Sequence, residues 1–275
     1  GNVIWRDTRP TNLPSSVSTD PSQWVSLDNV RFLTSPASTW TDPTLVNGWT
    51  SYGGGWGPAS FNNDSLGRTF IAGTVATPST YPPASGSQIL TYGSTFEPKM
   101  GSSGQTGIFA VNASNAFGMI NVAKNSLQFR APATTAGWQA YNLLYPNTTS
   151  PDFTDLALRN GYQNYSAPGT NGHTPASFYR YSDGLVVLRG VLFTGSRTIG
   201  TTIATLPPGS CTSSNYIFAT FGTKGDTDAD AATASGVPVQ PARINVSGCT
   251  IFLGSNTNAV GAMLGLDGIS FIADQ

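Results

Sequence analysis

Short alternations of hydrophobic and polar residues, separated by glycine, proline, asparagine and aspartate, run along most of the chain. Residues 68–75 (RTFIAGTV) alternate in this way, and residues 185–193 form a more continuously apolar run. Helical periodicity is missing, and many short strands with turns between them are typical of an antiparallel sandwich or jelly roll. We therefore expect an all-β fold, with further strands within residues 203–206, 216–221, 243–253 and 268–273.

An internal repeat organises this pattern. Residues 45–75 and 158–191 both carry Asn-Gly-aromatic, a tyrosine, a glycine-rich loop, Pro-Ala-Ser-Phe and a strand ending in glycine and valine. Residues 107–110 (GIFA) are echoed by residues 216–219 (YIFA). Two copies of one domain explain this shared order better than coincidence does. The paired landmarks are Asn47 with Asn160, Gly48 with Gly161, Trp49 with Tyr162, Tyr52 with Tyr165, Pro58 with Pro175, Phe61 with Phe178 and Gly73 with Gly190.

The repeat predicts two tandem antiparallel β-sandwich domains of jelly-roll type, over residues 45–150 and 151–275. Residues 1–44 precede them and have no counterpart in the second copy. This segment contains five prolines and three tryptophans, a composition that favours an extended arm with aromatic anchors over an independent core. We expect the arm to dock against neighbouring subunits or a larger particle.

Charge is unusually sparse, at 10% of residues and a net charge of −1. The thirteen basic residues are scattered singly, so we expect no nucleic-acid binding, which needs clustered lysine and arginine. No apolar run approaches the ~20 residues that cross a bilayer, so we expect no membrane insertion. The first residues do not resemble a secretory signal peptide, and export by that route is not expected.

Catalytic chemistry has few candidates. His173 is the only histidine and Glu97 the only glutamate. A histidine-dependent triad could therefore use only His173, and a catalytic pair of glutamates is excluded. The remaining aspartates mostly occupy turn positions, where the side chain caps its own backbone. We expect His173 to be a solvent-facing loop residue and the protein not to be an enzyme.

Asp226, Asp228 and Asp230 alternate and could converge on calcium if the segment turned tightly. An EF-hand loop would need glycine and glutamate where this chain has Ala231 and Val237. A solvated acidic loop is therefore the preferred interpretation, and we expect no cofactor.

Cys211 and Cys249 are the only cysteines and show no zinc-type spacing. They could form a disulfide, which would suit an extracellular particle, or remain two buried small hydrophobic residues. The sequence leaves both alternatives open.

Aromatic residues are better candidates for function. Those that recur in both copies, such as Trp49 and Tyr52, are expected to be packing residues. Trp56 and His173 lie in loops that differ between the copies, so we take them as candidate ligand contacts. Exposed aromatic rings on a surface of low charge bind sugar faces by stacking.

Four segments carry a resemblance to a known family. Residues 47–59 (NGWTSYGGGWGPA) are similar to a signature of bacteriophage tail-fibre and receptor-binding proteins. Residues 183–191 (DGLVVLRGV), 205–209 (TLPPG) and 266–271 (LDGISF) resemble a strand, a turn and a closing strand of the same family.

The resemblance implies a virion structural protein with a β-sandwich head, usually a homotrimer, located at the tail tip or fibre. It implies attachment to a host cell-surface glycan or protein, with residues 1–44 contacting other virion proteins. Its shared motifs are structural, so no binding residues carry over. A capsid decoration or head spike protein is the alternative. A polysaccharide depolymerase and a bacterial carbohydrate-binding module are less favoured.

Overall fold

The computed structural model describes residues 40–274, except 82, 85, 100–106, 114–115, 132–136, 166–172, 194, 197, 224–238 and 255–262. This described part is almost entirely antiparallel β-structure, as expected, and its one helical element is the short 3₁₀ turn η2 (Ser94–Phe96). Among the described residues, no helix is long and apolar enough to span a membrane.

The N-terminal half, residues 40–150, forms one nine-stranded sheet in the order β1-β5-β8-β7-β6-β9-β4-β2, with β3 also paired to β4. Its strands are β1 (Thr44–Leu45), β2 (Thr50–Ser51), β3 (Ser60–Asn63), β4 (Arg68–Ala76), β5 (Gln88–Thr91), β6 (Gly107–Ala113), β7 (Ala116–Val122), β8 (Ser126–Ala131) and β9 (Trp138–Pro146).

The C-terminal half, residues 151–274, forms an eight-stranded sheet, β11-β16-β19-β18-β17-β20-β15-β12, and a four-stranded sheet, β10-β13-β14-β21. Its strands are β10 (Thr154–Asp155), β11 (Ala157–Leu158), β12 (Gln163–Asn164), β13 (Ser177–Arg180), β14 (Leu185–Arg189), β15 (Val191–Phe193), β16 (Thr202–Thr205), β17 (Thr212–Thr223), β18 (Val239–Gly248), β19 (Thr250–Leu253), β20 (Met263–Gly265) and β21 (Ser270–Ile272).

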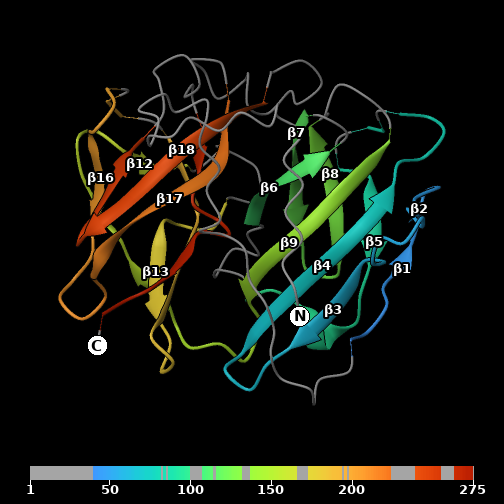
Figure 1. Cartoon of the computed structure of the whole chain (residues 1–275), viewed down its shortest axis with the longest axis horizontal. Helices are drawn as coiled ribbons and strands as arrows, with labels where there is room; N and C mark the ends of the chain where they lie inside the picture. The colour runs from blue at the N-terminus through green and yellow to red at the C-terminus, as the bar shows by residue number, and fades with distance from the viewer. Residues whose placement is uncertain are drawn as a thin grey trace, which may run out of the picture.

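The two halves share one strand order. The sequence β1-β5-β8-β7-β6-β9-β4-β2 corresponds strand for strand to β11-β16-β19-β18-β17-β20-β15-β12. The long strands β4 and β9 of the N-terminal half correspond to pairs of shorter strands, β14 with β15 and β20 with β21. In Figure 1 the halves lie side by side, with β6 and β7 of one next to β17 and β18 of the other.

A glycine marks where the long strand is interrupted in the C-terminal half. Gly190 lies between β14 and β15, and its N–H donates to the Asp267 side chain at 2.9 Å. Its counterpart Gly73 lies within β4. Both glycines have positive φ, 118° for Gly73 and 110° for Gly190. The landmark is glycine because the backbone of the Pro-Ala-Ser-Phe segment passes where a Cβ would be.

The Asn-Gly pair of the repeat forms the same tight turn in both halves. Asn47 and Asn160 both adopt φ of 54°, and Gly48 and Gly161 follow with φ of 79° and 81°. Two successive residues with positive φ define a type I′ turn, for which Asn-Gly is the preferred pair. Each asparagine Nδ2 also donates to a backbone carbonyl, of β5 in one half and of β16 in the other.

Glycine is needed at Gly161 because of its backbone conformation and not because of packing. It is exposed, whereas the aromatic landmark that follows it, Tyr162, is buried. The Tyr162 N–H donates to the Arg159 carbonyl at 3.1 Å and closes the turn around Gly161. A side chain at Gly161 would meet little, since the nearest atom to its Cβ position is 3.7 Å away, so the positive φ accounts for the glycine.

Each half encloses its own core. The C-terminal core joins Phe178 and Leu188 of the smaller sheet to Phe218 of the larger one, which is sandwich packing. The N-terminal core gathers a similar set from its single sheet, including Trp49 and Phe61.

Residues 1–39 of the expected arm lie outside the described residues. Thr41 forms an isolated bridge with Phe61, and β1 begins at Thr44, which pairs with Thr91, so the first sheet begins within the expected arm. The corresponding residues in the second copy, Thr154 and β11, pair in the same way with β13 and β16.

Candidate functional site

The halves meet along a buried seam made of two hydrophobic clusters. In the first, Met119 of β7 packs with residues of the C-terminal half, namely Tyr165, Val191, Phe221 and Met263. In the second, Phe70 and Leu144 pack with Tyr181 and Val187. Buried apolar contacts of this kind hold two units together as a core does.

Several charged side chains lie at this seam. Arg68 donates to Asp64 of its own hairpin and, through Nη1, to Asp183 of the other half at 2.6 Å. Its guanidinium also lies 5.1 Å from the centre of the Tyr181 ring. Lys99 likewise forms an ion pair with Asp152 of the other half. These two ion pairs link one half to the other.

Lys99 and Arg189 form the second polar group of the seam. Lys99 Nζ lies 2.8 Å from an Asp152 carboxylate oxygen, and this cation lowers the pKa of Asp152. Arg189 donates to Ser177 Oγ at 2.9 Å and to the Lys99 carbonyl at 3.3 Å. The Arg189 guanidinium lies 4.1 Å from the centre of the Phe153 ring, and burial lowers its pKa.

A small pocket opens between these groups. Lys99, Tyr145 and Pro146 line it from the N-terminal half, and Thr174, Arg189 and Asp267 from the C-terminal half. Because residues of both halves line the pocket, it is part of the seam. Its Arg189 and Lys99 already bond within the protein. Sequence reasoning did not single out these residues, because their proximity depends on how the halves pack.

An aromatic edge lies on the N-terminal half, formed by Tyr52, Trp56 and Trp138. Tyr52 is 42% and Trp56 60% exposed, and the Tyr52 and Trp138 rings lie 6.5 Å apart. Trp56 follows three glycines with positive φ, a conformation that favours glycine. The expectation that Tyr52 is a packing residue is wrong, whereas Trp49, Tyr162 and Tyr165 are buried.

His173 is not solvent-facing. It is only 7% exposed, and its ring lies 5.3 Å from that of Tyr165. The expectation failed because His173 and the adjoining Thr174 lie at the seam, whereas Trp56 does not. Trp56 stays a predicted contact residue, and the burial of His173 removes it from that role.

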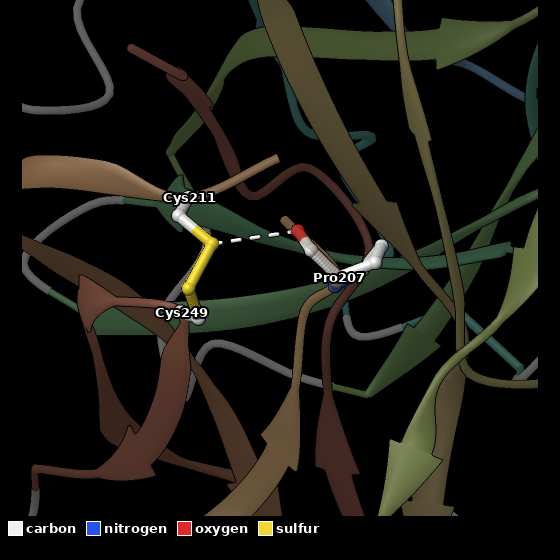
Figure 2. Close-up of a disulfide and its surroundings, with 3 residues drawn as sticks. All are labelled: Pro207, Cys211 and Cys249. Atoms are coloured by element: carbon white, nitrogen blue, oxygen red, sulfur yellow. Dashed lines mark hydrogen bonds between the residues drawn. A yellow bond between two sulfur atoms is a disulfide. The ribbon is translucent and has the colours of Figure 1, made fainter. Parts of the chain in front are cut away.

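Cys211 and Cys249 form a disulfide, with an S–S distance of 2.04 Å (Figure 2). It joins the start of β17 to the turn between β18 and β19, next to the Pro207 carbonyl. Asp226, Asp228 and Asp230 lie outside the described residues. Within the described residues, no group of three or more His, Cys, Asp or Glu side chains is arranged to hold a metal ion.

Comparison with protein-family models, curated proteins and solved structures finds no match to this chain.

Proposed function

We propose that this chain is a structural protein of a bacteriophage virion, a tail-fibre or tail-tip receptor-binding protein that attaches the particle to the host cell surface. The observation that carries the proposal is that three of the four segments resembling that family, all in the C-terminal half, form one connected unit. The strand 183–191 and the closing strand 266–271 pair directly, with Val186 opposite Phe271.

Backbone and side-chain bonds extend this unit. The Leu266 N–H donates to the Gly190 carbonyl at 2.8 Å, a further bond between the same two segments. The turn 205–209 leads to Cys211, whose carbonyl accepts from the Asp274 N–H beyond the closing strand. Motifs that assemble into one framework support descent from one domain better than scattered matches do.

Two properties of the molecule suit an extracellular particle. The disulfide persists in oxidising surroundings, and the low charge of the chain tolerates burial against other subunits. We propose host attachment through a surface glycan, with residues 1–44 contacting other virion proteins.

The location can be tested by immunogold electron microscopy of the parent virions, with antibody raised against this chain. Label at the distal tail is the expected result, and pre-immune antibody is the control. Label spread over the head would replace this proposal with capsid decoration. Virions without label would show that the protein is not part of the particle.

Attachment is tested separately by competition. The purified chain should reduce adsorption of the parent phage to host cells, and periodate oxidation of the cell-surface sugars should abolish binding of the chain. No competition at saturating protein would contradict receptor binding. Binding that survives periodate would indicate a protein receptor.

A further inference from the structure

Equivalent positions in the two halves differ sharply in exposure. Tyr52 corresponds to Tyr165 and Trp56 to His173, because the same backbone hydrogen bonds place them. The Tyr52 N–H donates to the Thr74 carbonyl, as the Tyr165 N–H donates to the Val191 carbonyl. The Thr74 N–H donates to the carbonyl of Gly57, and the Val191 N–H donates to that of Thr174. Gly57 directly follows Trp56, and Thr174 directly follows His173. Tyr52 is 42% exposed but Tyr165 only 3%.

Strand register gives three more correspondences. Trp138 pairs with the last residue of β4 as Met263 pairs with the last residue of β15. Pro146 pairs with the first residue of β4 as Ile272 pairs with the first residue of β14. Met119 has its counterpart in Arg243, since each faces the alanine of the repeated Ile-Phe-Ala segment; the two alanines are Ala110 and Ala219.

These correspondences define two surfaces on each half. The receiving surface contains Tyr165, His173 and Met263 in the C-terminal half, and Tyr52, Trp56 and Trp138 in the N-terminal half. The inserting surface contains Met119 and Pro146 in the N-terminal half, and Arg243 and Ile272 in the C-terminal half. Within one chain, the N-terminal inserting surface covers the C-terminal receiving surface.

The seam is therefore head-to-tail, and it leaves Tyr52, Trp56 and Ile272 exposed, whereas Arg243 is half-buried. A two-fold arrangement would bury Tyr52 and Tyr165 to the same extent, which is not observed. On the other side, Pro146 is buried at the seam whereas its counterpart Ile272 is 53% exposed. Three of the large exposed hydrophobic residues, Tyr52, Trp56 and Ile272, thus occupy positions that the seam covers in the other half.

We propose that a second copy of this chain occupies the aromatic edge, with Arg243 and Ile272 of one copy packing against Tyr52, Trp56 and Trp138 of the next. The contact repeats the internal seam, and a head-to-tail contact that closes on itself gives a ring. For a homotrimer the ring would contain six halves. This inference depends on the seam alone and holds whether or not the protein belongs to a phage.

The side chains that differ between the two contacts are chemically matched. Inside the chain, the Met119 side chain meets Tyr165 and Met263. Between copies, Arg243 would replace Met119 and meet Tyr52 and Trp138. A guanidinium over a tyrosine or tryptophan face is favourable, and more so when the contact excludes water. Where the internal contact has Met119 and Met263, the contact between copies would have Arg243 and Trp138.

Sedimentation velocity of the purified chain tests the proposal. We expect a discrete species of several copies, three if the ring is a trimer, rather than the 28.7 kDa monomer. Ile272→Ser and Tyr52→Ser should each lower the association constant at least tenfold. Ile199→Ser is the matched control, because Ile199 is equally exposed, at 56%, but precedes β16, a strand that contributes no residue to the seam clusters or the pocket.

Reversing the charge of Arg243 gives a second test of the contact, one that does not rely on shortening a side chain. Arg243→Glu should dissociate the ring, and circular dichroism should show an unchanged β-sheet fold. A wild-type chain that is monomeric at ~50 μM would overturn the proposal. An oligomer that Ile272→Ser and Tyr52→Ser leave intact would also overturn it. A monomer whose Tyr52→Ser and Trp56→Ser variants lose binding to host polysaccharide would assign the edge to a glycan instead.

Discussion

Gly190 shows how a single residue of the repeat is tied to backbone geometry. A Cβ there would lie 2.6 Å from the Pro175 carbonyl, and φ is 110°. We expect Gly190→Ala to destabilise the protein by about 3 kcal/mol or more, because the strain of that φ adds to a clash with fixed backbone.

Urea unfolding would measure this loss. Gly93→Ala is the control, since Gly93 has φ of −76° and open space around its Cβ position. A Gly190→Ala variant as stable as Gly93→Ala would contradict the stated role of the glycine.

Three buried tyrosines give a pH dependence. Burial raises the pKa values of Tyr92, Tyr141 and Tyr145 well above the usual value of about 10. A pKa raised by folding means that stability is complete below about pH 10 and is lost as pH rises further, because only the unfolded chain ionises there. The urea midpoint should fall between about pH 9 and pH 11. Full tyrosinate absorbance of the folded protein at about pH 10.5 would contradict this.

At the residue scale the sequence was informative wherever a side chain acts locally. The repeat paired Asn47 with Asn160, and both adopt the same backbone conformation; Trp49 and Tyr162 are buried as packing residues should be. It failed for Tyr52 and His173. Each has a counterpart with the opposite exposure, and the difference arises from the other half of the chain, which no local pattern encodes.

Among the elements, the hairpin closed by Cys211 and Cys249 carries a covalent link across 38 residues. In the chain-entropy account, closing a loop of that length stabilises the fold by about 4 kcal/mol. We expect the double variant Cys211→Ala/Cys249→Ala to lose roughly that much, measured by urea unfolding. The oxidised and thiol-reduced wild type should differ by a similar amount, and equal midpoints would contradict the prediction.

Strand existence was predictable because alternation and turn residues are short-range signals. Residues 68–75 lie in β4, residues 203–205 lie in β16, and the run 185–193 forms β14 and β15 on either side of Gly190. The interruption of the second run at Gly190 was not anticipated, because it depends on Asp267, 77 residues away. The domain boundaries stay a prediction.

Considering the whole molecule, the seam should make the two halves unfold together. Met119 is 4% exposed, and Met119→Asp would place a charge inside a hydrophobic cluster. We expect calorimetry to change from one transition for the wild type to two for this variant. Lys124→Asp, on the exposed turn after the same strand β7, is the control and should keep one transition. Two transitions in the wild type would contradict the cooperative role of the seam.

The linker between the halves has a consequence for assembly. Only residues 147–153 separate the end of β9 from the start of β10, so the halves are tethered closely. A short tether gives an effective concentration of about millimolar, and the internal contact therefore forms at any dilution. A contact between copies has no tether and depends on protein concentration. Dilution would therefore separate such an assembly into whole chains and leave each pair of halves together.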